Sequence, residues 1–385
     1  MKTKTKQLVG LFADFFENEK ASGIILIFCT AISIAIANSA FGKSYLDLWH
    51  TEILHHSLQH WINDGLMAIF FLLIGLEIER ELYVGELSDL KNASLPIAAA
   101  VGGMAIPALF HFALNRGSAT AGGAGIPMAT DIAFALGVLA LLGSRIPVSL
   151  KIFLTALAII DDLGAIIVIA VFYVADFSLA YFASALGIFA FLLGCNRLGV
   201  IRLPVYLTLG AVMWYFMLQS GVHATIAGVL LAFAIPFRGG DHHSPSHRLQ
   251  HFLHKPVAFV IMPLFALANT GITLADNWAS GLTSSNSLGI LAGLLAGKPL
   301  GIALFACLAV KLGLSRLPDS VSWRHIIGAG FLGGIGFTMS IFITLLAFDN
   351  PEIIETSKLS TLLTSVLAGS AGYLILAKAG EPQKN

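Results

Sequence analysis

The sequence predicts an all-α polytopic membrane protein with twelve transmembrane helices. Of its 385 residues, 57% are hydrophobic and only 11% are charged, whereas soluble domains carry about 25% charged residues. The apolar residues gather in runs long enough to cross a bilayer as helices, which takes roughly 17–25 residues each. The loops between the runs are short and polar, so residues 1–385 are expected to form one integral membrane domain.

Each expected span is an apolar run bounded by polar or charged residues. The runs cover residues 21–38, 58–80, 94–114, 124–143, 148–174, 178–196, 203–219, 221–236, 256–273, 288–311, 325–348 and 358–378. Ahead of the first run, Leu8, Leu11, Phe12 and Phe15 recur at helical spacing with charged residues between them. This pattern predicts a short interfacial helix at residues 7–18.

The basic residues indicate the orientation of these spans. With the N-terminus in the cytoplasm, 18 of the 22 Lys and Arg residues fall on the cytoplasmic side and three on the outer side, and Lys298 remains inside a span. Cytoplasmic loops carry the excess of Lys and Arg in multi-pass proteins, so both termini are expected in the cytoplasm. The 22 acidic residues balance the basic ones, and this neutrality gives no indication of a nucleic-acid partner.

Two of the expected spans contain helix-breaking residues near their middle. One reads GIPMATDIAF at residues 125–134, and the other reads GGIGFTMSIF at residues 333–342, with Gly336 and Thr338 ahead of a renewed apolar run. These are the fourth and eleventh spans, and paired interruptions in matching positions indicate an inverted repeat, here spans 3–5 and 10–12. Ordinary glycines and prolines in closely packed helices are the alternative explanation of this feature alone.

Two adjacent carboxylates, Asp161 and Asp162, lie in the middle of the fifth span. A single Asp at the centre of the bilayer costs about 2.5–3.5 kcal/mol on insertion scales, and neighbouring like charges resist ionising together. An ionisable residue within the membrane therefore indicates a functional site, here one that binds a cation or protons. Successive residues are about 100° apart around a helix, so one carboxylate can line a cavity while the other meets a neighbouring helix.

Three further polar residues in the spans extend this site. Lys298 is near the centre of the tenth span and needs a carboxylate partner, for which the Asp pair is the obvious candidate. Thr130 and Asp131 follow the first interruption, where Asp131 could balance the positive ends of half-helices. Three carboxylates and one lysine leave a net negative site, which suits a monovalent cation or protons. Hard oxygen ligands favour Na+ or Li+ over soft metals.

A second group of titratable residues is expected near the cytoplasmic surface. Glu77, Arg80 and Glu81 border the second span and predict an interfacial ion-pair network, with pH sensing as the alternative. His251 and His254 belong to a His-rich loop that precedes the ninth span. A solvated loop is the plainer explanation than a metal site, although histidines titrate in a range that suits pH sensing.

Four motifs carry a resemblance to a known family. They are ATDIAFALG at 129–137, AIIDDLGA at 158–165, GKPLG at 297–301 and GIGFTMS at 334–340. Together with WIND at 61–64 and GVHAT at 221–225, they closely resemble the NhaA Na+/H+ antiporters of bacterial inner membranes. The resemblance covers nearly the whole chain, and the set of motifs is specific.

The resemblance implies crossed, interrupted fourth and eleventh helices and a role for each site residue. Asp162 would be the direct cation ligand, and Asp161 its proton-carrying neighbour, paired with Lys298 in one state. Thr130 and Asp131 would sit at the crossing. The implied activity is not enzymatic and needs no cofactor: electrogenic exchange of one cytoplasmic Na+ or Li+ for two external H+, switched on at alkaline pH, in sodium and pH homeostasis.

The chain departs from the family pattern in two places. Gln250 stands where the family often has a glutamate in its pH-sensing region, which weakens the transfer of that role to this position. The first outer loop, residues 39–57, looks short for the β-hairpin through which family members dimerise. A homodimer therefore does not transfer directly from the resemblance.

Three other classes of membrane protein can be weighed against this interpretation. An intramembrane aspartyl protease needs two Asp residues on separate helices, one of them in a GxGD motif that is absent here. A passive cation channel would need a filter-like repeat, and none is present. An organic-anion symporter on a related inverted-repeat fold remains the alternative, although the central Asp pair and Lys298 favour protons and small cations.

Overall fold

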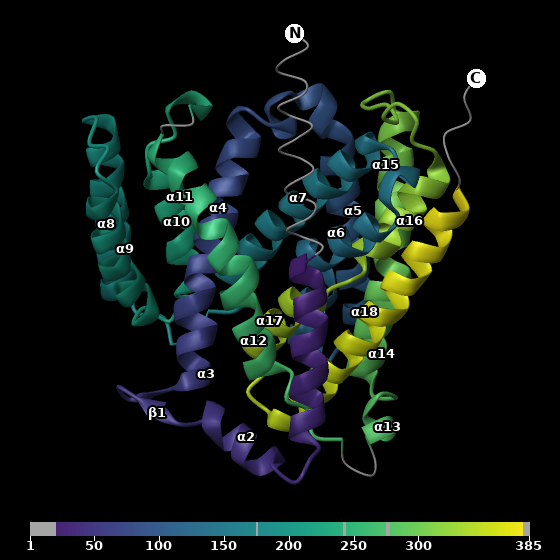
Figure 1. The fold of residues 1–385 in the computed structure, drawn as a ribbon, viewed down its shortest axis with the longest axis horizontal. Coiled ribbons are helices and arrows are strands. Elements are labelled where there is room, and N and C mark those ends of the chain that lie inside the picture. Colours follow the sequence, from purple (N-terminus) through teal and green to yellow (C-terminus); the bar gives the residue numbers. More distant parts are fainter. Residues whose placement is uncertain (1–20, 175, 242–243, 275–277, 380–385) are drawn as a thin grey trace.

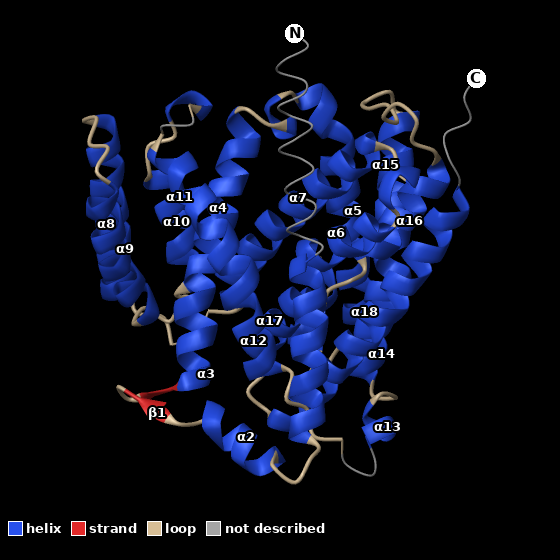
Figure 2. Cartoon of the chain, in the orientation of Figure 1, coloured by secondary structure: helices blue, strands red, loops and turns tan. Residues whose placement is uncertain are grey.

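A computed structural model describes residues 21–174, 176–241, 244–274 and 278–379. Over these ranges the protein is a bundle of helices with one small hairpin (Figures 1 and 2). The elements of the first half are the helix Ala21–Ala37, α2 (Gly42–Trp49), β1 (Glu52–Ile53), β2 (His56–Ser57), α3 (Leu58–His60), η1 (Trp61–Leu66), α4 (Met67–Tyr83), η2 (Glu86–Ser88), α5 (Leu90–Asn115), η3 (Ala121–Met128), α6 (Ile132–Leu141), η4 (Gly143–Arg145) and α7 (Val148–Phe172).

The second half continues with a pair of peripheral helices and then returns to the centre of the bundle (Figure 1). Its elements are α8 (Leu179–Arg197), α9 (Leu203–Leu218), α10 (Thr225–Ala234), η5 (Arg238–Gly240), α11 (Pro245–Pro256), η6 (Val257–Ile261), α12 (Met262–Asn269), α13 (Trp278–Gly281), α14 (Ser285–Ala292), η7 (Gly293–Gly297), α15 (Lys298–Lys311), α16 (Trp323–Gly333), α17 (Phe337–Ala347) and α18 (Pro351–Ala379).

The number and length of the helices confirm the polytopic membrane fold. Within the described ranges, eight helices are long and apolar enough to cross a membrane, and two bent helix pairs raise the number to ten. The shorter apolar helices α9 and α10 occupy the two remaining predicted positions. The interfacial helix expected at residues 7–18 lies outside the described residues.

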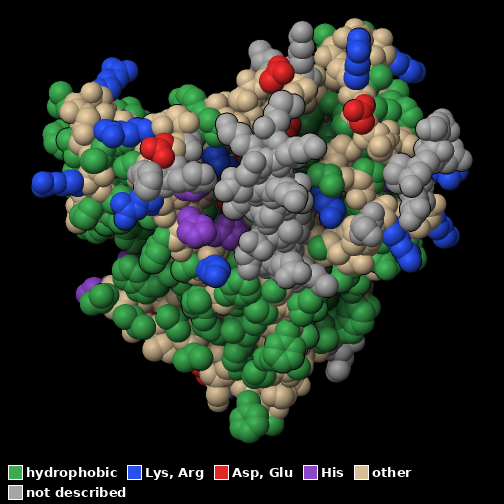
Figure 3. Space-filling view, turned by 45° about the horizontal axis from the view of Figure 1, so that its top comes forward, with side chains coloured by type: hydrophobic (Ala, Val, Ile, Leu, Met, Phe, Trp, Pro, Cys, Tyr) green, Lys and Arg blue, Asp and Glu red, His purple; other side chains and the backbone are tan. Residues whose placement is uncertain are grey.

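Side chains on the surface are segregated along the bundle. Figure 3 shows Lys and Arg gathered around the upper end of the molecule, above a broad belt of hydrophobic side chains. A belt of this kind faces lipid in a membrane protein, and a basic end is typical of the cytoplasmic side. The end at which Lys and Arg gather is therefore called the basic end.

The first outer loop contains a β-hairpin, so the expectation that it is too short for one is wrong. Strands β1 and β2 pair antiparallel through a two-residue turn, in which Leu54 and His55 have φ values of 51° and 69°. Positive φ at both central residues is the geometry of the tightest hairpin turns, which is why six residues suffice. Trp61 Nε1 donates to Ile53 O at 2.8 Å and ties the hairpin to the second span.

Both predicted interruptions are present. In the fourth span, the tight turns of η3 end at Met128, the next residues are extended, and a regular helix begins again at Ile132. In the eleventh span, α16 ends at Gly333 and α17 starts at Phe337, with a bend of 46° between them. The two interruptions touch, because Asp131 N donates to Ile335 O at 2.7 Å.

The helices around these interruptions form two units of the same pattern. Uninterrupted α5 and α7 flank the first broken span, and uninterrupted α14–α15 and α18 flank the second, as the inverted repeat requires. The first helices of the two units pack backbone to backbone along glycines spaced four residues apart, Gly289, Gly293, Gly297 and Gly301. Small residues permit such close approach of helices in lipid.

The tightest point of this contact generates a stability prediction. A Cβ on Gly301 would lie 2.1 Å from the Gly102 carbonyl oxygen, a backbone atom that cannot rotate away. We expect Gly301→Ala to destabilise the protein by about 1–3 kcal/mol, measured as a lower Tm in detergent. Gly187→Ala is the matched control, since a Cβ there meets nothing within 4 Å. An equal Tm for both variants would contradict the tight contact.

Candidate ion-binding site at the helix crossing

The acidic pair of α7 is fully enclosed by the protein. Asp161 is 0% exposed and Asp162 2% exposed, and the two side chains face different surroundings. Asp161 Oδ2 lies 2.6 Å from Lys298 Nζ and accepts a hydrogen bond of 2.7 Å from Thr130 Oγ1. Asp162 instead lines a cavity. This division matches the rotation of about 100° between successive residues of a helix.

Lys298 connects the acidic pair to the first interrupted span. Its ammonium group is completely buried, and besides Asp161 it donates to the carbonyl oxygen of Met128, the last residue of η3. Carbonyl groups at the end of a helix have no partner within that helix. Lys298 therefore neutralises one carboxylate and also satisfies one free helix end.

Thr130 is in the extended segment and links the acidic pair to the other interrupted span. Its Oγ1 is 2.7 Å from Asp161 Oδ2 and 2.8 Å from the Gly333 carbonyl oxygen at the end of α16. A hydroxyl has a single proton to donate, so it serves one of these two acceptors at a time. If Asp161 took up a proton, it could donate to Thr130, and Thr130 could then donate to Gly333.

Asp131 caps the starts of both half-helices with one carboxylate. Its Oδ1 accepts from Phe134 N at 3.0 Å, at the start of α6. Its Oδ2 accepts from Thr338 N at 3.1 Å and from Thr338 Oγ1, at the start of α17. Free N–H groups and the helix dipole make a helix start electropositive. A single negative charge therefore stabilises two opposed positive ends in the centre of the protein.

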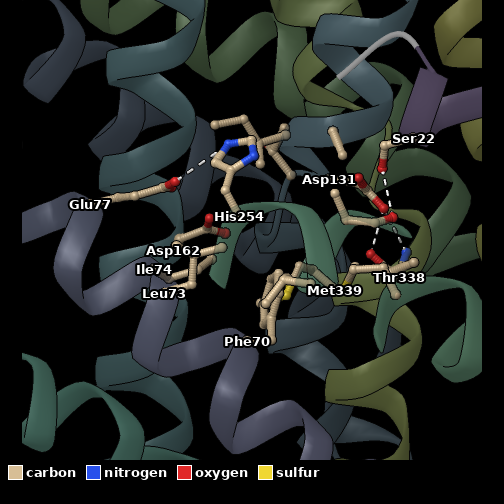
Figure 4. A pocket seen from close by; sticks show the side chains of 16 residues that line it. Ser22, Phe70, Leu73, Ile74, Glu77, Asp131, Asp162, His254, Thr338 and Met339 are labelled. Atoms are coloured by element: carbon tan, nitrogen blue, oxygen red, sulfur yellow. Dashed lines mark hydrogen bonds and ion pairs between the residues drawn. The ribbon is translucent and has the colours of Figure 1, made fainter. Parts of the chain in front are cut away.

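A narrow cavity of about 60 Å³ lies beside these groups (Figure 4). It passes from Asp131, Thr338 and Asp162 along the face of α4 that carries Phe70, Ile74 and Glu77. A water molecule needs about 10–15 Å³ of such space, so the cavity has room for a small ion together with water.

The acidic pair retains unused hydrogen-bonding capacity. Asp161 Oδ1 and Asp162 Oδ1 are both buried and have no hydrogen-bond partner among the described residues. Leaving a buried polar atom unpaired costs about 1–3 kcal/mol. A proton or a small cation with oxygen preference would supply the missing interaction, so the chemistry of the pair fits both.

Comparison with known proteins decides between the membrane-protein classes. The family model described as Na+/H+ antiporter 1 matches residues 13–376. The chain belongs to the NhaA family of Na+/H+ antiporters. It is 62% identical over 379 residues to the Na(+)/H(+) antiporter NhaA of Dechloromonas aromatica, with 97% of each chain covered.

Two other relatives of this NhaA-family protein show the same coverage. Na(+)/H(+) antiporter NhaA 1 of Flavobacterium johnsoniae is 58% identical, over 98% of this chain and all of the relative. Na(+)/H(+) antiporter NhaA of Vibrio alginolyticus is 51% identical, over 94% and 96% of the two chains. The resemblance inferred from the motifs is confirmed. The family consists of ion transporters, so the protein is not an enzyme.

The residues considered for pH sensing separate into two groups in this NhaA-family structure. Glu77 lines the cavity, where His254 Nε2 approaches its carboxylate at 4.0 Å. Gln250 is buried on the same helix as His254, α11. Arg80 pairs with Glu81 at 2.8 Å, and neither of these two residues lines the cavity. His251 is exposed.

The structure shows part of the ion-pair network predicted along the second span, the Arg80–Glu81 pair. Glu77 and Glu79 are two residues apart, so they point to different sides of α4. Glu77 faces the cavity, whereas Glu79 is buried and accepts a hydrogen bond of 3.0 Å from Ser246 Oγ. Of the acidic residues in this segment, only Glu81 pairs with Arg80 in the described structure.

Sequence reasoning missed several groups at the site. The carbonyl oxygens of Met128 and Gly333 accept from Lys298 and Thr130, and backbone groups leave no trace in side-chain composition. Ser22 lines the cavity from the first span and donates to Ala258 O at 3.1 Å. A lone serine at the start of an apolar run carries no signal that separates it from ordinary helix packing.

The buried ion pair leads to a second stability prediction. Lys298→Ala leaves the Asp161 carboxylate buried and uncompensated, and breaking a buried pair by removing one partner costs about 3–5 kcal/mol. We expect a clearly lower Tm in detergent at about pH 8.5. The loss should shrink in acidic buffer, because protonation of Asp161 removes the uncompensated charge.

The double variant Lys298→Ala with Asp161→Asn is the matched control for this prediction. It has no buried charge to compensate at either position, so its Tm should lie above that of the single variant. An unchanged Tm in Lys298→Ala would show that the pair does not stabilise the crossing.

Proposed function

We propose that this protein exchanges cytoplasmic Na+ or Li+ for external H+, with Asp162 as the direct cation ligand and Asp161 beside it. The observation that carries the proposal is that the buried Asp162 lines the cavity while its Oδ1 atom has no hydrogen-bond partner among the described residues. Thr130 and Asp131 complete the polar wall of that cavity. The three relatives described above are named as Na(+)/H(+) antiporters, which supports the same reaction.

The exchange follows from competition for one site. At low pH the carboxylates hold protons and offer no charge to Na+; at high pH they lose their protons and a dehydrated cation can bind. Like charges this close resist being ionised together, so cation binding and proton release favour each other. Two protons for each Na+ or Li+ would move one net charge across the membrane, which makes the exchange electrogenic.

The arrangement of the cavity supports access from the basic end, which we take as cytoplasmic. The cavity passes from Asp162 to Glu77 on α4 and to His254 on α11, and α11 lies nearer the basic end than α12, which follows it (Figure 1). On the opposite side, the buried rings of Phe71, Phe342 and Phe265 meet with centroid distances of 5.4 and 6.2 Å. Rearrangement around the crossing would open the other side.

With this orientation, we propose that both termini are cytoplasmic and that the protein lies in the bacterial inner membrane, as the family resemblance implies. The hairpin of residues 52–57 is then on the outer face, at the end opposite the basic end (Figure 2). We also propose that the protein forms a homodimer through this hairpin, as the family resemblance implies. The organic-anion symporter is not supported, because the carboxylates of Glu77, Asp131 and Asp162 line the cavity and would repel an anion.

The group at the mouth of the cavity supports activation at alkaline pH. His254 and Glu77 approach each other there, with 4.0 Å between His254 Nε2 and the Glu77 carboxylate. A protonated imidazole beside the path would repel an approaching Na+, whereas a neutral one would leave the Glu77 carboxylate free to attract it. Arg80, Glu81 and His251 lie near this mouth and would adjust its charge rather than contact the ion.

Removing the carboxylate of Asp162 tests the proposed reaction directly. We expect Asp162→Asn to abolish Na+-driven proton movement in sealed proteoliposomes, together with the membrane potential that the exchange generates. A pH-sensitive dye and a voltage-sensitive dye measure the two effects. The Tm of the variant should not fall, since Asn also fits the buried position.

Asp349→Asn is the matched control, because Asp349 is exposed in the loop after α17. It should retain full exchange and full voltage. Undiminished proton movement in Asp162→Asn would refute the assignment of the site. Exchange that generates no membrane potential would refute the ratio of two protons for each Na+ or Li+. It would not contradict the assignment of Asp162 as the cation ligand.

The role of the cavity mouth gives a pH-dependent prediction. His254→Ala removes the imidazole that becomes positive in acid, so Na+ should enter at lower pH. We expect the half-maximal point of the activity profile to move by about 0.5–1 pH unit toward acid, with transport rates measured in proteoliposomes over a pH series. His50→Ala is the control, since His50 is exposed beyond α2. An unshifted profile for His254→Ala would exclude the imidazole from pH control.

A further inference from the structure

Part of the wall of the ion cavity comes from the first and ninth spans, which lie outside the crossing. Ser22, in the first helix, and Ala258, in η6, both line the cavity. The two residues are in direct contact, because Ser22 Oγ donates to the Ala258 carbonyl oxygen at 3.1 Å. In Figure 4, Ser22 lies on the same side of the cavity as Asp131, and Asp162 lies on the other side. A cation bound by Asp162 would therefore share a small cavity with an uncharged oxygen of the first span.

The Ala258 carbonyl lacks a backbone donor from its own helix. In an α-turn it would accept from Met262 N, four residues on, but Met262 N donates to Val257 O in the π-turn η6. In a continued π-turn it would accept from residue 263, which is Pro263 and has no N–H group. Among the described residues, Ser22 supplies the donor. A carbonyl oxygen has two lone pairs, so one of them remains after Ser22 has bonded.

The Ser22 hydroxyl also keeps free lone pairs. A hydroxyl has one proton to donate and two lone pairs with which it can accept. The proton of Ser22 is directed at Ala258 O, and no donor among the described residues bonds to Ser22 Oγ. The residue is 1% exposed and lines the cavity. Its hydroxyl therefore presents lone pairs, and not its proton, to the cavity.

A free carbonyl of the same origin occurs in the tenth span, but away from the cavity. Lys298 N donates to Gly293 O in η7 and Pro299 follows, so Leu294 O likewise lacks both helical donors. This oxygen lies against the backbone of the eleventh span, where a Cβ on Gly334 would be 2.4 Å from it. Leu294 does not line the cavity. Of the two free carbonyls, the one in the ninth span is therefore available to an ion in the cavity.

We propose that Ser22 Oγ and Ala258 O are ligands of the transported cation, together with the carboxylate of Asp162. Uncharged oxygens suit a hard monovalent cation, and carbonyls freed from helices coordinate Na+ in transporters with interrupted spans. This inference rests on the proposed exchange of Na+ or Li+ for H+. It adds ligands that do not titrate and that set the preference between the two cations.

The variant Ser22→Ala removes one of these ligands and leaves the acidic pair unchanged. We expect the KM for Na+ to rise about three- to tenfold, as for the loss of one polar interaction. The KM for Li+ should rise less, because Li+ is smaller and takes fewer oxygen ligands, and ligand number governs such selectivity. Exchange is measured in proteoliposomes at one alkaline pH over Na+ and Li+ concentration series. Calorimetry in detergent at the same pH measures Na+ binding without transport.

Ser33→Ala is the matched control, because it removes the same kind of bond between the same two spans. Ser33 Oγ donates to Leu267 O at 3.0 Å and is fully buried. It is roughly 16 Å along the helix from Ser22 and does not line the cavity. The Tm of this variant reports what the loss of such a bond does to stability, whereas its KM values for Na+ and Li+ should equal those of the wild type.

Two results would overturn the proposal. An equal KM for Na+ in Ser22→Ala and Ser33→Ala would leave Ser22 with a structural role only. An equal rise of the KM values for Na+ and Li+ in Ser22→Ala would indicate a distorted cavity instead of a lost ligand. If the wild type binds Na+ in calorimetry but does not exchange it, the proposed function fails, and the Na+ affinities of the two variants still decide the role of Ser22.

Discussion

Two helices stop in the middle of this membrane protein, and the backbone groups that they leave unpaired have to be satisfied there. Water and lipid headgroups are both out of reach at that depth, so protein groups must do it. Asp131 binds the starts of α6 and α17, and Lys298 binds the end of η3. Thr130 is within hydrogen-bonding distance of the end of α16. The crossing is stable because the free N–H groups at the helix starts meet a carboxylate, and the free carbonyl oxygens at the helix ends meet hydrogen-bond donors.

The same groups also form the wall of the ion site, which couples structure to occupancy. Lys298 holds a helix end and a carboxylate at once, and Thr130 can donate to either the carboxylate or a second helix end. A change of charge at Asp161 therefore alters the hydrogen bonds that hold the crossing. No separate relay is needed, since the ion site and the junction of the half-helices share the same side chains.

Much of this arrangement was accessible from the sequence because the membrane makes polar residues costly. Asp161, Asp162 and Lys298 are conspicuous in long apolar runs, and their burial follows from the position of those runs. The interruptions are equally plain, since Gly and Pro followed by Thr break an apolar pattern at two matching places. The motif resemblance then extended the interpretation from isolated residues to the whole chain.

What could not be predicted depends on backbone geometry and on which face of a helix a residue occupies. The Met128 and Gly333 carbonyls are acceptors only because their helices end there. The hairpin of residues 52–57 depends on positive φ angles at Leu54 and His55, residues that rarely adopt them. Glu77 and Glu79 look alike in the sequence. Only the structure shows that Glu77 extends from α4 into the cavity, whereas Glu79 extends from another side of α4 and accepts a hydrogen bond from Ser246.

The glycine contact between the two repeats also bears on how the molecule can move. At Gly102 and Gly301, a Cβ on either residue would meet the backbone of the other helix, so the absence of side chains lets α5 and α15 lie unusually close together. Lys298 is the first residue of α15 and is therefore anchored beside this contact. A motion that transfers the site from one side of the bilayer to the other while keeping the contact intact would carry both helices and Lys298 together.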